Sequence, residues 1–303
     1  MSVPFDRVVE AFKLGADARR DSDAPVRVDV RVDSSATPAL VDIIRRALVP
    51  QTTNALVRVG RLSDREPVKS DTDVVIVITC GSDGLEDSVR DLVVYGCPVV
   101  VVAESSVEVP FITYDAPMLG LVSATDECHL LSELAAWILA RVRNQTAFAA
   151  NFAFMREEAS SGIVGQAVAA NALTGALDFI PGADFPVMTA TQVGMMLKLA
   201  ASHGKPINHE RLYDAAGIVA CALLLRVLSR AVSSRCGALG FVAKSTIAGA
   251  GTYTMGRALG ALYESGFDYS PLDDAIRGVA AKFQPADGED AVADLVPVHV
   301  SEC

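Results

Sequence analysis

The sequence has no surplus of positive charge. Its 303 residues include 26 Lys and Arg against 37 Asp and Glu, which gives a formal net charge of -11. A nucleic-acid-binding protein gains much of its affinity from basic patches that replace the counterions of the phosphate backbone. Anionic lipid headgroups attract the same kind of basic surface. The composition therefore argues against a nucleic-acid partner and against electrostatic attraction of the whole surface to a membrane.

Paired cysteine spacings are also missing. The six cysteines stand apart from one another, at Cys80, Cys97, Cys128, Cys221, Cys236 and Cys303. Isolated thiols are typical of a reducing compartment, so we expect a cytoplasmic protein with free cysteines. His129 follows Cys128, but no second ligand pair stands at zinc-binding spacing, and we expect no metal or other cofactor. His203 and His209 flank a predicted loop, where we expect both to be exposed.

Long uninterrupted apolar runs are absent as well. The run 215–225 ends after 11 residues at Arg226, and Lys244 interrupts the run 237–251. A helix that spans a bilayer needs about 20 apolar residues. These lengths favour buried helices of a soluble bundle over membrane spans, although insertion of the helices stays open as an alternative.

Strand and helix patterns alternate between residues 26 and 143. Residues 26–32 (VRVDVRV) alternate Val with polar residues, which predicts a strand with one polar face, of the kind found at a sheet edge. The continuous runs DVVIVITC (73–80) and PVVVVA (98–103) predict central parallel strands that are covered on both faces. Further strands are expected at 55–60 and 118–123, and helices at 39–48, 84–96 and 128–143. This alternation predicts a mostly parallel sheet with flanking helices.

From about Thr146 the apolar period becomes helical throughout. Helices are expected at 147–159, 162–178, 185–203, 208–233 and 237–264. The last of these is rich in Gly and Ala, which favours close packing against other helices or against a partner. The predicted fold class is therefore α/β plus all-α. The predicted domains are an α/β domain at 1–145, a bundle of helical hairpins at 146–284 and an acidic, disordered tail at 285–303.

A Pro-Gly turn joins two of the predicted helices within residues 176–206 (ALDFIPGADFPVMTATQVGMMLKLAASHGKP). Pro181 cannot continue the first helix and Gly182 permits a positive φ, so the chain is expected to reverse there. Asp184 is expected to cap the second helix. Pro186 is tolerated in its first turn, where the missing N–H has no partner within the helix.

The polar residues around this turn have structural roles in our main interpretation. Asp178 lies near a helix C-terminus, where the helix dipole disfavours an acid, so we expect it to pair with Lys198 or Arg257. A carboxylate pair of Asp178 and Asp184 for acid–base or metal chemistry is the alternative, but no His or third acid lies nearby in sequence. Gln192 is a polar point on an apolar helix and is expected to form a hydrogen bond between helices.

The segment 176–206 resembles the helical DUF697 domain, which bacterial proteins carry beside or fused to Era-like GTPase domains. Residues 70–105 are similar to the middle of such a GTPase domain, with Asp73 where that family places the Asp that opens a strand. MLGLVSAT (118–125) is similar to its last strand. The resemblance implies a GTPase-like α/β domain in front of a DUF697-like domain. It also implies a protein partner, with a true GTPase as one candidate.

The nucleotide-binding residues of that GTPase family are missing. A phosphate loop needs GxxxxGK[ST], in which Gly backbone N–H groups and the Lys surround the phosphates. The matching segment here, DSSATP (33–38), has neither Gly nor Lys and begins with an acid. AESS (103–106) replaces the guanine-reading NKxD, and GRLS (60–63) replaces DxxG. We therefore expect a pseudo-GTPase that does not hydrolyse GTP.

Four polar residues follow predicted strands, at the edge where open α/β sheets place their ligands: Ser34, Ser35, Asp83 and Glu104. They are the candidates for a residual pocket, in which the two serines could hold a small anion weakly. The main interpretation is again structural. Ser34 or Thr37 is expected to cap the next helix, and Asp83 or Ser82 to cap the helix that follows the turn 81–84.

Three hypotheses about function are open. The first is a non-catalytic regulatory or scaffold protein that acts by protein contact. The second is a membrane-associated protein, at the inner face of the cell membrane, whose helical hairpins bind or insert into the bilayer. The third is a nucleotide-binding, GTPase-like enzyme with an atypical phosphate loop. Each is compatible with a homo-oligomer, and the first is our main hypothesis.

Overall fold

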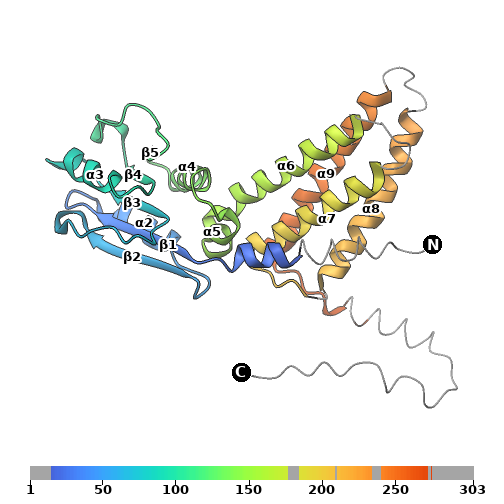
Figure 1. The fold of residues 1–303 in the computed structure, drawn as a ribbon, viewed down its shortest axis with the longest axis horizontal. Helices are drawn as coiled ribbons and strands as arrows, with labels where there is room; N and C mark the ends of the chain where they lie inside the picture. The colour runs from blue at the N-terminus through green and yellow to red at the C-terminus, as the bar shows by residue number, and fades with distance from the viewer. Residues whose placement is uncertain (1–14, 177–183, 209, 234–239, 272–273, 275–303) are drawn as a thin grey trace, which may run out of the picture. The chain divides into compact units, whose positions relative to one another are not determined.

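The structure is a computed structural model that describes residues 15–176, 184–208, 210–233, 240–271 and 274. It combines a parallel five-stranded sheet and its flanking helices with a set of long helices (Figure 1), so the predicted class, α/β plus all-α, is confirmed. The contacts gather Met1–Ser265 into one compact unit and Gly266–Cys303 into a second. The boundary predicted at 145–146 stays a prediction, and the predicted tail at 285–303 lies outside the described residues.

All pairings within the sheet are parallel. Its strands are β1 (Val26–Val32), β2 (Ala55–Arg61), β3 (Val74–Ile78), β4 (Val99–Ala103) and β5 (Leu119–Ser123), in the order β2-β1-β3-β4-β5. The first strand thus lies inside the sheet, the second is added at one edge, and the chain then crosses over to build the other side. The order reverses between β1 and β3, and open α/β sheets bind ligands outside the carboxyl ends of the strands at such a point.

Helices cover both faces of the sheet, which explains the continuous Val/Ile runs of β3 and β4. α2 (Pro38–Ala47) and α4 (Glu127–Leu139) pack with Val30, Ile76 and Ile78 into the core of one face. α3 (Leu85–Val93) packs with Val75, Val77 and their neighbours on the opposite face.

The polar residues of β1 do not lie at an edge, as their alternation had suggested. β1 lies between β2 and β3, and the side chains of Asp29 and Arg31 are buried. Arg31 Nε lies 2.7 Å from Asp29 Oδ1, and Nη2 donates to Oδ2 at 3.0 Å. The pair keeps two charges inside because each supplies the counter-charge of the other. The prediction of an edge position was therefore wrong.

The helical part begins differently from the prediction. α5 (Gln145–Asn151) ends at Phe152, whose side chain is buried in the same core as β1 and α2, and a 3-10 turn, Ala153–Met155, follows. α6 (Arg156–Ala176) then runs without a break through residues 160–161, where two separate helices were expected. The break falls earlier because Phe152 turns into the core with an extended backbone.

Three more long helices follow α6: α7 (Asp184–Ser202), α8 (Glu210–Ser233) and α9 (Gly240–Ser265). α9 contacts α6, α7 and α8, in line with its many small residues. A Cβ atom on Gly175 of α6 would lie 3.2 Å from the Ala248 side chain of α9, and Ser245 Oγ donates to the Ala172 carbonyl at 2.9 Å. The two backbones are therefore close enough that only small side chains fit between them.

Candidate functional site

The loops that follow β1 and β3 meet at the carboxyl edge of the sheet, where the strand order reverses. Asp33 N donates to the Ile78 carbonyl at 2.9 Å, and Thr79 N donates to the Val102 carbonyl at 3.1 Å. Each strand thus extends by one paired residue before its loop begins. These backbone bonds set Asp33 and Thr79 side by side, although 46 positions separate them in sequence.

The Asp33 carboxylate is the centre of a hydrogen-bonded cluster. Ser35 Oγ donates to Oδ2 at 2.5 Å, Thr79 Oγ1 donates to Oδ2 at 2.8 Å, and the Ser34 backbone N–H donates to Oδ1 at 2.8 Å. Ser35 Oγ also accepts from the Cys80 backbone N–H at 3.0 Å. Asp33 is only 8 % exposed. The neighbouring hydroxyl and amide groups therefore replace water around this carboxylate.

The environment favours the charged form of Asp33. Burial raises the pKa of its carboxyl, but hydrogen bonds from Ser35, Thr79, Ser82 and the Ser34 backbone lower it, and the net pKa lies below the ordinary value. Among the described residues no basic side chain forms an ion pair with Asp33, so its negative charge is met by neutral dipoles alone. Buried charges are normally paired or bound to a metal.

Glu104 enters the same edge from the end of β4. Thr37 Oγ1 donates to Glu104 Oε1 at 2.5 Å and accepts from the Leu40 backbone N–H at 3.3 Å. Thr37 is therefore the N-cap of α2, with Pro38 in the first turn. It joins the start of this helix to the loop after β4.

The remaining candidate, Asp83, follows Ser82, a hydrogen-bond donor to Asp33, but its own side chain faces solvent. It is exposed in the turn before α3, and the N-cap of that helix is Gly84, without a side-chain hydrogen bond. The expected cap at Asp83 or Ser82 is thus not found. Gly81 is the conformationally restricted residue of the turn, because its φ is +83° and a Cβ atom there would lie 2.7 Å from the Glu108 carbonyl oxygen.

This geometry is unfavourable for a phosphate group. Ser35 Oγ and the Ser34 N–H, the expected anion ligands, both donate to Asp33 instead. The Asp33 carboxylate would also repel a phosphate at close range. The arrangement supports the prediction that the chain lacks phosphate-loop chemistry.

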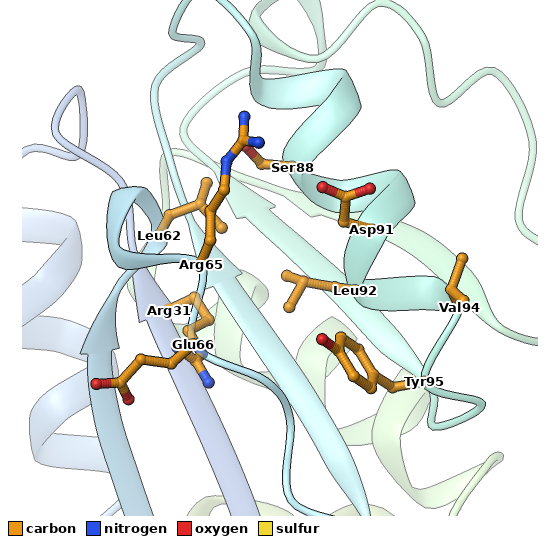
Figure 2. Close-up of a pocket in the computed structure, with 9 residues that line it drawn as sticks. All are labelled: Arg31, Leu62, Arg65, Glu66, Ser88, Asp91, Leu92, Val94 and Tyr95. Atoms are coloured by element: carbon orange, nitrogen blue, oxygen red, sulfur yellow. The ribbon is translucent and has the colours of Figure 1, made fainter.

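A separate cavity of about 310 Å³ lies on the α3 side of the sheet (Figure 2). Tyr95 turns back from the end of α3 toward Arg31 and Leu62, whereas Glu66 points away from the helix. The cavity is lined by Arg31, Leu62, Arg65, Glu66, Ser88, Asp91, Leu92, Val94 and Tyr95. Charges of both signs line it and Arg31 is already paired with Asp29, so the cavity selects no class of ligand by charge.

The helical part has a polar interior. Thr252 Oγ1 accepts from Asn171 Nδ2 at 2.8 Å and from Gln192 Nε2 at 3.2 Å, and all three residues are buried. The hydrogen bond expected between helices at Gln192 is therefore present, and it joins α7 to α9. Lys198 is exposed on α7.

Most of the predicted Pro-Gly turn cannot be compared with the structure. Asp178, Pro181 and Gly182 lie outside the described residues. The described part of α7 runs from Asp184 to Ser202 and includes Pro186.

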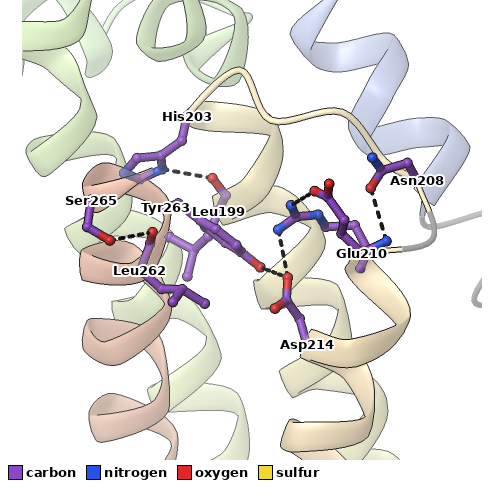
Figure 3. A network of polar contacts seen from close by, with 9 residues as sticks. Leu199, His203, Asn208, Glu210, Asp214, Leu262, Tyr263 and Ser265 are labelled. Carbon is purple, nitrogen blue, oxygen red and sulfur yellow. Dashed lines mark hydrogen bonds and ion pairs between the residues drawn. The ribbon is translucent and has the colours of Figure 1, made fainter. Parts of the chain in front are cut away.

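A second buried polar group joins α8 to α9 and to the end of α7 (Figure 3). Arg211 Nη1 donates to Asp214 Oδ2 at 2.6 Å, Arg211 Nη2 donates to Glu210 at 3.0 Å, and the Tyr263 hydroxyl donates to Asp214 Oδ2 at 2.8 Å. His203 packs beside the Tyr263 ring, with 6.0 Å between ring centroids. The expected exposure of His203 was therefore wrong, because the α7–α8 connection turns inward there; His209 lies outside the described residues.

The outward face of α8 is apolar. Leu212, Leu224 and Val227 are 69 %, 70 % and 68 % exposed, whereas Arg211 and Asp214 on the same helix are buried. In the part of the chain that the structure describes, one helix segment, Glu210–Val232, is long and apolar enough to cross a membrane, and it contains an 18-residue window with a mean hydropathy of 1.9. The sequence run 215–225 predicted a shorter apolar segment, because the charged residue Arg226 ends the uninterrupted run.

Comparisons with protein-family models, with curated proteins and with solved structures each found no match. The resemblance to DUF697 and to Era-like GTPases therefore stays a prediction that depends on the residues quoted above.

Proposed function

We propose that this chain is a non-catalytic contact protein that associates with a membrane through the outward face of α8. The observation that carries the proposal is the segment Glu210–Val232, which contains an 18-residue apolar window of which only 11 % is buried. The sheet and its flanking helices contact a partner protein rather than bind or hydrolyse a nucleotide, because Asp33 stands where a phosphate loop needs Gly and Lys.

The two ordinary explanations of such a helix do not fit. Core helices of soluble proteins are apolar because they are buried, but Leu212, Leu224 and Val227 each expose about two thirds of their surface. A signal sequence lies near the N-terminus, whereas α8 begins at Glu210. Exposed apolar patches of this extent are typical of protein or membrane interaction sites.

The distribution of polarity in the helices favours a bilayer. Asn171, Gln192 and Thr252 are buried between α6, α7 and α9, while large apolar side chains lie on the outside. Helices in a bilayer gain little from burying leucine, and they associate through small residues and hydrogen bonds between helices. The close α6–α9 approach at Gly175 and the Thr252 hydrogen bonds are contacts of this kind.

The dimensions of α8 are also suitable. Its 24 residues rise about 36 Å at 1.5 Å per residue, against a hydrocarbon thickness of about 30 Å. Arg226 and Arg230 lie in its last two to three turns, from where long basic side chains can extend to the headgroup region.

The partner of the α/β layer is a second element of the proposal. The resemblance to domains found beside Era-like GTPases supports a true GTPase as the protein partner. The Asp33 cluster, which is unfavourable for a phosphate group, supports the view that this chain contacts its partner without hydrolysing GTP. Titration of the full chain with GTP, GDP and ATP in the presence of Mg²⁺ tests the second point. Micromolar binding of any of these nucleotides would overturn it.

Flotation with neutral phosphatidylcholine vesicles tests the membrane contact, because the chain is acidic and the proposed contact is apolar. We expect the full chain to float, and the double variant Leu224→Gln/Val227→Gln to float less. Val94→Gln/Val107→Gln is the matched control, since both valines are exposed in the α/β part. If the wild-type chain instead stays in solution as a dimer, the exposed apolar face of α8 binds a second copy of this chain and not a membrane.

A further inference from the structure

The carboxyl edge of the sheet contains a carboxylate, Asp33, that forms no ion pair with any basic side chain in the described part of the chain. Asp33 is more than nine-tenths buried, and its hydrogen-bond donors are the side chains of Ser35, Thr79 and Ser82 and the Ser34 backbone. In contrast, the equally buried Asp29 and Asp214 each have an arginine partner. Buried charges in proteins are normally paired with an opposite charge or coordinate a metal ion.

The groups around Asp33 are the ligands of a hard divalent cation. Ser35 and Thr37 follow Asp33 at the second and fourth positions of the same loop, and Thr79 comes from the end of β3. Ser35 Oγ lies 3.2 Å from Thr79 Oγ1, so the hydroxyl oxygens lie next to one another as well as next to the acid. Neutral oxygens and carboxylates, with no thiolate or imidazole, suit Mg²⁺ or Mn²⁺ rather than zinc or copper.

Glu104 supplies a second carboxylate at the same edge. It follows β4, the strand beside β3, and its Oε1 accepts from Thr37 at 2.5 Å. We propose that Asp33, Ser35 and Thr79 form a binding site for one divalent cation of the Mg²⁺/Mn²⁺ class, with Thr37 and Glu104 as further oxygen ligands from the same edge of the sheet. Mg²⁺ sites in proteins commonly use one or two carboxylates and keep several waters, which this set of side chains allows.

The composition of the site explains why ligand spacing did not reveal it. The described residues contain no group of three His, Cys, Asp or Glu side chains that suits a metal. Here two acids come from different strands, and the other ligands are hydroxyls. The proposal does not depend on membrane association or on a GTPase partner.

Calorimetric titration of the full chain with Mg²⁺ and with Mn²⁺ tests the site. We expect one saturable site of millimolar affinity or tighter, and a loss of at least about tenfold in Asp33→Asn, since disturbed metal-site contacts typically cost 10–100-fold. Asp83→Asn is the matched control, because Asp83 is an exposed acid at the same edge and lies outside the cluster. It should bind as the wild type does.

A measurement on the wild-type chain covers the case in which Asp33→Asn does not fold. Mn²⁺ is paramagnetic, so substoichiometric Mn²⁺ should broaden the backbone NMR signals of residues 33–37 and 79–81 before those of the exposed acids on α3. Broadening that begins elsewhere, no saturable binding at millimolar concentrations, or equal losses in Asp33→Asn and Asp83→Asn would each overturn the proposal.

Discussion

The hydroxyl of Tyr263 donates to Asp214 Oδ2 at 2.8 Å and thereby joins α9 to the first turns of α8. The same carboxylate oxygen accepts from Arg211, so one buried acid holds two groups from two helices. This contact holds the N-terminal end of α8, the helix that has the apolar outward face. At this end the inward side of α8 forms polar contacts, while Ile218 further along the helix packs into an apolar core.

Tyr263→Phe should destabilise the chain. The substitution removes one hydrogen bond to a charged, buried acceptor, which typically contributes about 1.5–3 kcal/mol. Tyr253→Phe is the control, because Tyr253 lies on the same helix with its side chain half exposed. Denaturant unfolding of the two variants should show a clear loss for Tyr263→Phe and almost none for Tyr253→Phe. Equal losses would mean that the Tyr263 hydroxyl contributes no specific stability.

Gly81→Ala should cost more stability than Gly96→Ala. Both glycines have a positive φ, +83° and +79°, so each substitution pays about 1–2 kcal/mol for a left-handed alanine. At Gly81 the new Cβ would also lie 2.7 Å from the Glu108 carbonyl oxygen, whereas nothing lies within 4 Å at Gly96. The free energies of unfolding of the two variants provide the comparison. If they match, the loop after β3 moves away from Glu108 at no cost.

Asp73→Asn should stabilise the chain at neutral pH. Burial raises the pKa of the Asp73 carboxyl, and the hydrogen bond from the Arg27 N–H at 2.7 Å offsets this only in part. A raised pKa means that the contribution of Asp73 to stability is most favourable below the ordinary value of 3.8 and is lost as the pH rises through the folded-state pKa. The amide carries no such penalty and can still accept from Arg27.

Thermal unfolding as a function of pH tests this prediction. The melting temperature of Asp73→Asn should exceed that of the wild type at pH 7, and the difference should shrink as the pH falls toward 3.8. A constant difference across this range, or a less stable variant at pH 7, would contradict the prediction.

Several elements were predictable because their signals are local. The Val/Ile runs of β3 and β4 and the helical period of residues after Thr146 depend on which face of an element is buried, and this appears within one segment. The missing phosphate-loop residues at 33–38 are likewise visible without a structure. The start of α6 was not predictable in this way, because burial of Phe152 against the sheet decides it.

The candidate site depended on pairings between distant segments. The sequence placed Ser34, Ser35 and Glu104 after strands, but it did not single out Asp33 and Thr79 as partners. Those two residues meet only because β1 and β3 are neighbours in the sheet. The polar alternation of β1 was misleading for the same reason, since Asp29 and Arg31 neutralise each other inside the molecule.

By itself, the sequence determined that the chain is acidic, combines α/β and helical segments, and contains no GxxxxGK[ST] motif. Only the tertiary structure decided which apolar residues are buried, and it left Leu224 and Val227 of α8 facing outward while Arg211 and Asp214 face inward. Composition records how much apolar surface a helix has. Which side of the helix faces outward depends on the neighbours that form hydrogen bonds with its polar residues. Those neighbours come from other parts of the chain.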